Sequence, residues 1–371
     1  MLRRTSTPRL FIPVVLLIFT FGLTSLATAG EFTREFTIDA DQFQLINLIG
    51  EIQLVASDGD DIEILIEVSG DDADEDLIEI EVNEGRRAEV AILFPIGEER
   101  NYVYPKLGRG SRTTINMSSD HGDHGDTGSW LHKLFGGLHG QQIKVSGKGS
   151  GLEVWADVLI RVPDGKDVKV RHGVGVIEAE GITGDLFLDI NSGPVYARDI
   201  KGDLTADTGS GSVELRNITG NCTADTGSGS VEIFGFTGKE LLVDTGSGSV
   251  TVDEIDCDRL LIDTGSGGVR AKGVKANSAK IDTGSGSVKL FLDRMGDGRF
   301  VVDTGSGSIT LVLPADASAE VVADTGSGSI TVDVEDVDFH KRKRDHMEFT
   351  IGDGDARVTL DAGSGSIRVR Q

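Results

Sequence analysis

The sequence predicts an all-β fold, a β-solenoid (β-helix) whose chain winds through stacked coils of about 18–21 residues behind an N-terminal β-rich cap. Three observations support this prediction. A short motif repeats at a near-constant interval, apolar and polar residues alternate around each copy, and Gly is abundant (50 of 371 residues) while aromatic residues make up only 5%. The pattern leaves the handedness of the solenoid, right or left, open.

The repeated motif is the hexapeptide DTGSGS. Two variants, DTGSGG at Asp263 and DAGSGS at Asp361, belong to the same series. From Asp207 onward, successive copies are separated by 18, 19, 19, 19, 21, 21 and 37 residues. The identical copies begin at Asp207, Asp225, Asp244, Asp282, Asp303 and Asp324. Because so short a unit cannot bury an apolar face alone, each unit must stack on its neighbours, at the ~4.8 Å spacing of paired strands.

Residues around each motif alternate as in a strand. Near Asp244, Leu241 and Val243 point to one face and Leu242 and Asp244 to the other. Aligning the units predicts two inward columns: Val213, Val231, Val250, Val269, Val288, Ile309 and Ile330; and Leu204, Cys222, Leu241, Leu260, Ala279, Phe300 and Val321. The paired glycines of each motif, such as Gly246 and Gly248, are expected to adopt the positive φ of a tight corner.

Residues 1–29 read as a secretory signal peptide. Three Arg precede an apolar stretch, and Ala27-Thr28-Ala29 supplies the small residues before a cleavage site. We therefore expect an exported protein that is periplasmic, at the cell surface or secreted. With no second apolar span in the sequence, the mature chain is not expected to cross a membrane.

The remaining sequence divides into three segments. Residues 30–104 read as hairpins and opening coils. Residues 105–150 form a Gly/His/Asp-rich insertion, read mostly as a mobile loop, with a short amphipathic helix around residues 130–138. Residues 151–371 form the repeat domain, interrupted by a second insertion at about 335–348.

Charge and cysteine content restrict the function classes. The net charge is -25, and a polyanion repels nucleic-acid phosphates, so we expect no nucleic-acid partner. Cys222 and Cys257 are about two coils apart, roughly 9.6 Å along the stack, which is too far for a disulfide. Both are expected to be free thiols.

The repeated aspartates present an electrostatic problem. Carboxylates ~4.8 Å apart repel each other by about 3.5 kcal/mol at an effective dielectric constant of 20. Asx-turns, in which each carboxylate accepts N–H bonds from the following Gly or Ser, are the favoured explanation. A row of bound cations, such as Ca²⁺, is the alternative, with these candidate ligands: Asp207, Asp225, Asp244, Asp263, Asp282, Asp303 and Asp324. No other cofactor is expected.

Asp-Thr-Gly is also the catalytic triplet of aspartic proteases, in which two carboxylates face each other and share a proton. Stacked copies at one corner offer no unique facing pair. We therefore interpret the triplet as structural and expect no catalytic residue.

One outward row of the coils carries apolar residues beside the aspartates. Thr205, Thr223 and Lys280 share this row with the candidate partner contacts, which are Leu242, Leu261, Val301 and Val322. The N-terminal region or the insertion at 105–150 is an alternative cover for them. The corresponding row on the other strand is polar and runs through Glu214, Glu232, Thr251, Arg270, Lys289, Thr310 and Thr331.

These features resemble a bacterial family of putative-adhesin repeats. The resemblance rests on repeated (D/N)-x-x-S-G-S/D-(V/I) units, on Gly50-Glu51-Ile52 in the lead-in, and on the phrase RVPDGKDVKV at residues 161–170. It covers residues 31–371 apart from the insertion near 105–148. It implies a secreted or envelope β-solenoid of unknown biochemical function, with no catalytic residues to transfer.

The sequence thus favours a non-catalytic, exported binding or structural scaffold in the cell envelope, with an envelope protein or a glycan as partner and with self-association as a further option. A cation-stabilised surface protein is the alternative. An enzyme acting on acidic polysaccharide is a more remote one, because near-identical corners offer no singular cleft.

Overall fold

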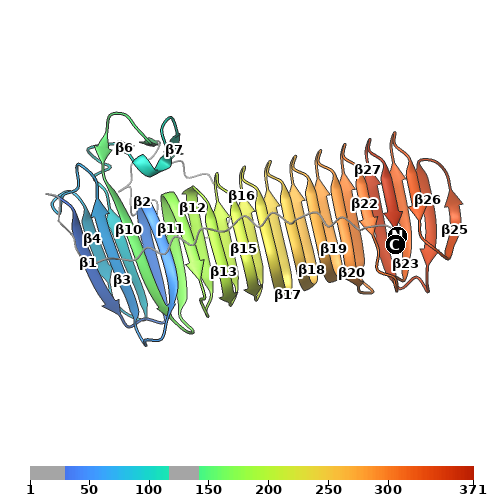
Figure 1. The fold of residues 1–371 in the computed structure, drawn as a ribbon, viewed down its shortest axis with the longest axis horizontal. Coiled ribbons are helices and arrows are strands. Elements are labelled where there is room, and N and C mark those ends of the chain that lie inside the picture. Colours follow the sequence, from blue (N-terminus) through green and yellow to red (C-terminus); the bar gives the residue numbers. More distant parts are fainter. Residues whose placement is uncertain (1–29, 117–141) are drawn as a thin grey trace, which may run out of the picture.

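A computed structural model describes residues 30–116 and 142–371, and these residues are built almost entirely from β-strands. The predicted signal peptide and the predicted helix around residues 130–138 lie outside the described residues. The strands form one sheet of 24 strands and a second sheet of four. Figure 1 shows the long sheet wound into a rod, with the N-terminal part at one end and a hairpin at the other. The all-β, solenoid-like prediction is confirmed.

Each repeat contributes one strand to each of two sides of the rod. We call the side that carries the repeated aspartates the Asp face. It is formed by β12 (Leu186–Ser192), β14 (Leu204–Thr208), β16 (Cys222–Thr226), the C-terminal parts of β17 (Val231–Thr245), β18 (Val250–Thr264) and β19 (Val269–Thr283), and then β21 (Arg299–Thr304), β27 (Ala356–Ala362) and β23 (Ala319–Thr325).

We call the opposite side the mixed-charge face. It is formed by β13 (Val195–Lys201), β15 (Val213–Thr219), the N-terminal parts of β17, β18 and β19, and then β20 (Val288–Met295), β22 (Ile309–Val312), β28 (Ile367–Arg370) and β24 (Ile330–Asp333). All neighbours on this side are parallel, so equivalent residues of successive repeats stack on one another.

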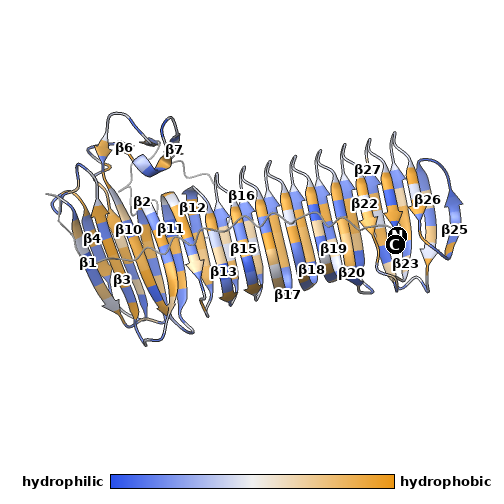
Figure 2. Cartoon of the chain, viewed as in Figure 1, coloured by the Kyte–Doolittle hydropathy of each residue, from blue (hydrophilic) through white to orange (hydrophobic). Residues whose placement is uncertain are grey.

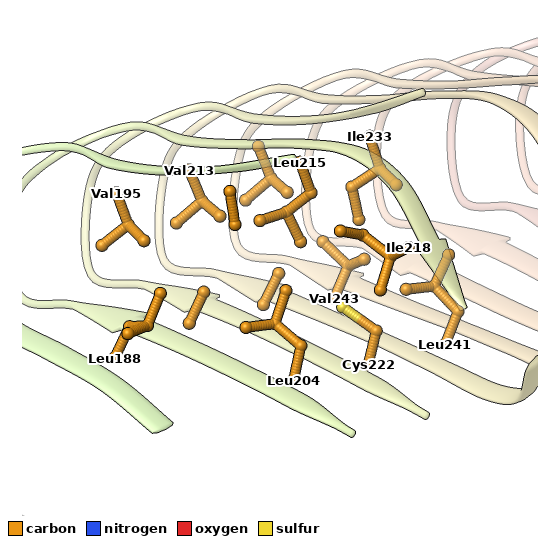
Figure 3. Close-up of a cluster of buried hydrophobic side chains, with 14 of the residues drawn as sticks. Leu188, Val195, Leu204, Val213, Leu215, Ile218, Cys222, Ile233, Leu241 and Val243 are labelled. Atoms are coloured by element: carbon orange, nitrogen blue, oxygen red, sulfur yellow. The ribbon is translucent and has the colours of Figure 1, made fainter. Parts of the chain in front are cut away.

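The core is the narrow space between the two faces. Val213, Val231 and Val250 are consecutive partners in one inward column and are fully buried. Leu204, Cys222 and Leu241 are consecutive in the other, and Figure 3 shows side chains from both columns meeting in the interior. Alternation of apolar and polar residues along the strands is visible throughout the rod (Figure 2). This period-two burial is what the sequence pattern predicts.

At the N-terminal end, two long strands, β2 (Gln42–Ser57) and β11 (Asp167–Glu180), pair in parallel and serve as opening coils. Two further parallel strands, β5 (Arg87–Leu93) and β10 (Trp155–Pro163), and then antiparallel strands cover the end. β5 and β4 (Glu79–Asn83) extend one side, and β10, β3 (Ile62–Ser69) and β1 (Phe32–Ile38) extend the other. The predicted β-rich region thus protects an edge that would otherwise pair with other chains.

The first insertion carries more structure than the mobile loop expected there. Its described parts contain a short 3₁₀-helix, η1 (Pro105–Leu107), and two strands, β7 (Arg112–Asn116) and β8 (Gln142–Ser146), which form the second sheet together with the flanking strands β6 (Asn101–Val103) and β9 (Leu152–Glu153). The ring of Tyr104 lies 5.8 Å from that of Trp155 on β10, centroid to centroid. Apolar contact therefore anchors this sheet to the rod.

At the C-terminal end, the coils do not follow chain order. β27 pairs with β21 on one side and with β23 on the other, and β28 lies between β22 and β24 in the same way. Residues 356–370 therefore form a coil that is inserted between two earlier ones. The expectation that Asp303 and Asp324 occupy neighbouring coils is wrong, because Asp361 lies between them.

A hairpin closes this end of the rod. β25 (Val337–Arg342) and β26 (His346–Ile351) are antiparallel, and β26 pairs with β23 (Figure 1). The second insertion predicted at about 335–348 corresponds to most of this hairpin. The described parts of the chain contain no helix with the length and hydropathy that a membrane crossing needs. Cys222 and Cys257 are buried free thiols, as predicted.

Candidate binding surfaces

The corner after each aspartate is held by a threonine hydroxyl. Thr264 Oγ1 donates to the carbonyl of Gly248 at 3.0 Å and accepts the N–H of Gly267 at 3.1 Å. The N–H of Gly265 donates to the carbonyl of Thr245 in the preceding coil. Neither Gly N–H therefore remains for the Asp263 carboxylate, so the glycine part of the predicted Asx-turn is wrong at this corner. The residue that fixes the corner is the buried Thr of the motif.

The corner glycines are required by close approach and not by backbone conformation. Gly246 and Gly248 have φ outside the left-handed region, contrary to the prediction. A Cβ on Gly248 would lie 1.7 Å from the carbonyl oxygen of Gly229, and one on Gly246 would lie 2.4 Å from that of Gly227. The glycines thus let successive corners stack at the spacing of the strands.

The aspartates form one continuous ladder on the Asp face. In register order its nine members are Asp189, Asp207, Asp225, Asp244, Asp263, Asp282, Asp303, Asp361 and Asp324. A basic residue stands in register at each end. Arg171 is the partner of Asp189, and His346 is the partner of Asp324. His346 Nδ1 is hydrogen-bonded to Asp324, and its Nε2 lies 2.6 Å from Glu348 Oε1.

Proximity of like charges shifts the titration of the ladder. Burial and the carboxylates of Asp225 and Asp263 raise the pKa of Asp244. Burial and the carboxylate of Asp207 raise the pKa of Asp189 to about 7, although Arg171 acts in the opposite direction. The hydrogen bonds to Asp324 and Glu348 raise the pKa of His346. Asp189 and Asp244 therefore hold protons more tightly than isolated aspartates do.

The ladder carboxylates stand in single file. Within residues 30–116 and 142–371, no three His, Cys, Asp or Glu side chains converge in an arrangement that could hold a metal ion. The candidate ligands predicted from the sequence thus lie in a row, and cation binding along that row stays a prediction.

The predicted contact row runs beside the ladder on the Asp face. Leu242 and Leu261 are register neighbours and half-buried, whereas Lys280 separates Leu261 from Val301. Thr359 stands between Val301 and Val322, because the inserted coil lies there. Val322 is 38% exposed. The apolar part of the row is therefore one adjacent pair and two separate residues, and a role in partner contact stays a prediction.

The mixed-charge face carries exposed rings that the sequence analysis missed. Phe234 is 41% exposed and Tyr196 is 37% exposed, and both lie on its outward side. Phe291 is half-buried on the same face under the guanidinium of Arg270, whose Cζ lies 5.3 Å from the ring centroid. Their alternation with inward aliphatic residues such as Val195, Ile233 and Leu290 was readable in the sequence. Because the adjacent row is polar, the sequence analysis took this whole side as polar and overlooked the rings.

A shallow recess lies where η1 meets the opening coils, and Lys106 forms ion pairs with two acids that line it. Lys106 Nζ lies 2.9 Å from Asp157 Oδ2 and 3.1 Å from Glu51 Oε2. Burial alone would lower the pKa of Lys106, but these two carboxylates raise it overall. The recess is lined by Glu51, Gln53, Leu65, Glu67, Lys106, Asp157, Val158 and Leu159. The lysine occupies the position that a cation would take among these acids.

Several solved structures resemble the chain. They include a putative cell adhesion protein from Clostridium sporogenes (12% identity, 92% of this chain and 99% of that one, TM-score 0.18). A putative lipid binding protein from Parabacteroides distasonis shares 15% identity over 91% and 97% of the two chains, with a TM-score of 0.38. A putative adhesin from Bacteroides fragilis shares 12% identity over 92% and 98%, with a TM-score of 0.35. These values are too low for the roles of those proteins to transfer to this chain.

No curated protein matches the chain. A family model, by contrast, matches residues 155–370, which include the stacked repeats, the Asp ladder and the mixed-charge face. The match covers more than half of the chain and coincides with the stacked coils described above. The chain belongs to the Toastrack DUF4097 family, which agrees with the adhesin-type repeat resemblance of its sequence.

Proposed function

We propose that this chain is an exported, non-catalytic scaffold of the cell envelope that binds an envelope protein or a glycan along the Asp face. The observation that carries the proposal is the form of that face, a long parallel ladder of near-identical rows with half-exposed apolar side chains. Ladders of this kind offer extended contact surfaces. Catalysis instead needs a concave site with convergent groups.

The recess beside η1 supports a structural role for the acids that line it. Lys106 binds Glu51 and Asp157 directly, so these carboxylates neutralise a cation within the chain. A carboxylate engaged in this way is a poor general base. The proposal therefore assigns the recess to the attachment of the second sheet.

Photo-crosslinking in the native cell tests the binding role. A photoreactive residue at Leu261 reports on the Asp face, and one at the exposed Thr251 reports on the mixed-charge face. We expect a dominant adduct with one envelope component from Leu261 that is absent from Thr251 and is lost in Leu242→Ser. Adducts confined to the chain itself would show that the apolar pair is covered and would contradict the proposal.

Export is tested separately by fractionation. The full chain and a chain lacking residues 1–29 are expressed in the same cells, and both are followed by a C-terminal tag. We expect the full chain outside the cytoplasm and shortened by residues 1–29, and the deleted form inside. Retention of the full chain in the cytoplasm would contradict an envelope role.

A further inference from the structure

The mixed-charge face bears charges that are sorted along the rod. Its outward residues form one column of register partners, which continues at both ends the polar row noted in the sequence. In order along the rod the column contains Glu178, Tyr196, Glu214, Glu232, Thr251, Arg270, Lys289, Thr310, Arg368 and Thr331. The three acids precede Thr251 and the three bases follow it. In this column the acids thus lie on one side of Thr251 and the bases on the other, in a chain whose net charge is -25.

We propose that two copies of this chain associate through their mixed-charge faces, antiparallel to each other and related by a two-fold axis at Thr251. The axis runs along the strands, so each copy reverses the coil order of the other. A residue a given number of coils before Thr251 then faces the residue the same number of coils after it. This self-association is independent of partner binding on the Asp face.

The charges on this column are complementary in that arrangement. One coil from the axis, Glu232 of one copy faces Arg270 of the other. Two coils away, Glu214 faces Lys289, and four coils away, Glu178 faces Arg368. The intervening position places Tyr196 against Thr310. Shifting the axis by half a coil in either direction leaves fewer acid–base pairs, which is why the geometry selects Thr251.

On either side of the axis, where Asp253 of the two copies face each other, the neighbouring column matches rings with cations. In register order it contains Arg198, Arg216, Phe234, Asp253 and Lys272, followed beyond a bulge by Phe291. The same axis places Phe234 of one copy opposite Lys272 of the other, and Arg216 opposite Phe291. Cations stack favourably on aromatic faces. The two exposed rings of this face, Phe234 and Tyr196, would thereby be removed from water.

Contacts within the chain do not remove the polarity of the face. Glu214 is bound by Arg216 at 2.6 Å, and Lys272 by Asp253 at 3.3 Å. Both pairs are partly exposed, so each can still take a second partner of opposite charge. Arg270 instead lies over the Phe291 ring. Burial and the carboxylate of Glu51 raise the pKa of Glu178, as expected for an acid that would gain from a cation.

The size of the face suits a modest, salt-sensitive dimer. Eight coil steps from Glu178 to Arg368 span about 38 Å, and two outward columns with their neighbours are about 15 Å wide. The two copies together would bury roughly 1,200 Å², the lower end of specific interfaces. Because charges provide much of the specificity, the affinity should fall as salt screens them.

Sedimentation velocity of the purified protein over a range of concentrations tests the proposal. At about 50 mM salt we expect dimers, and near 0.5 M salt we expect monomers. Arg270→Glu with Lys289→Glu reverses the two bases nearest the axis, and Glu214→Lys with Glu232→Arg reverses the two acids nearest it. Each double variant alone should weaken dimerisation at least about 100-fold.

Restoration of dimers provides the sharper result. Mixing the two double variants should restore dimers, and so should combining all four substitutions in one chain, because each acid again faces a base. Lys280→Glu on the Asp face is the matched control and should leave dimerisation unchanged. Circular dichroism and thermal melting establish that every variant is folded.

Three outcomes would overturn the proposal. The wild-type protein could be monomeric at all concentrations, the double variants could dimerise like wild type, or the mixture could fail to restore dimers. A wild-type monomer that binds heparin, with binding abolished by Arg270→Glu and Lys289→Glu, would assign the basic half to anionic glycans instead.

Discussion

Two adjacent glycines in the corner after Asp263 have different surroundings. A Cβ on Gly267 would lie 1.6 Å from the carbonyl oxygen of Gly248, whereas one on Gly268 would have its nearest neighbour at 3.5 Å. Other copies of the motif carry Ser at the position of Gly268. The first glycine is therefore fixed by the stacking of coils, and the second is free to vary.

This contrast gives a matched pair of substitutions. Gly267→Ala should lower the free energy of unfolding by at least about 2 kcal/mol, because the coils must separate to admit the methyl group. Gly268→Ala should change it by less than about 0.5 kcal/mol. Urea unfolding measures both. Equal effects would show that the corner glycines serve some other need.

The inward column supplies a second matched pair. Val250 is fully buried and Thr251 is exposed on the mixed-charge face. Val250→Asp places an unpaired charge in the core and should cost about 4 kcal/mol or more, unfolding the coils around it. Thr251→Asp should retain the β circular dichroism and the melting temperature. Survival of Val250→Asp with both intact would refute the column.

At the scale of elements, protonation of the Asp face stabilises the fold, whereas protonation of paired carboxylates usually destabilises proteins. Burial and then the neighbouring carboxylates raise the pKa of Asp244, so the folded chain keeps this proton up to a higher pH than the unfolded chain, whose aspartates ionise near 3.9. The stability provided by that proton is present below about pH 3.9 and is lost as the pH rises through the raised pKa. At neutral pH, the ionised ladder repels itself.

We therefore expect Asp244→Asn to raise the melting temperature at pH 7 by about 1–3 °C, a modest value because the carboxylate is partly exposed to solvent. The gain should shrink toward pH 4. Differential scanning calorimetry across this range provides the test, with the exposed loop residue Asp297 mutated to Asn as the control. A gain that is constant with pH would exclude repulsion as its cause.

Cation binding to the same ladder makes an opposing prediction. If Ca²⁺ offsets the repulsion, EDTA should lower the melting temperature by several degrees and added Ca²⁺ should restore it. Our expectation is that EDTA has no effect, because strand pairing and the threonine corners hold the ladder and basic residues stand at both ends. A drop reversed by Ca²⁺ would establish the cation-stabilised alternative.

At the scale of the whole molecule, the sequence predicted the stacked coils, both inward columns and the capping regions, because alternation and repeat spacing encode them directly. It could not predict where residues 356–370 lie. A coil containing DAGSGS stacks equally well on any other coil, so chain order was the only available guide. The order of the charges on the mixed-charge face can be read from the aligned repeats. The exposure of Phe234, by contrast, could be predicted only once the two faces of the rod were known.

The inserted coil ties the order of the rod to residues 356–370. Residues 319–333 are synthesised before residues 356–370, yet among the described strands they pair with the preceding coils only through them, since their other partner is the hairpin strand β26. A growing or translocating chain therefore cannot join this coil to the preceding ones until residues 356–370 are present. Removing residues 356–371 should leave the coil of β23 and β24 detached and open to proteases at about residue 314, while β11 to β20 stay protected. Limited proteolysis with mass spectrometry would show this, and a truncated chain as resistant as the full one would refute it. The architecture thus makes the protease resistance of one coil depend on a segment that follows it in the chain.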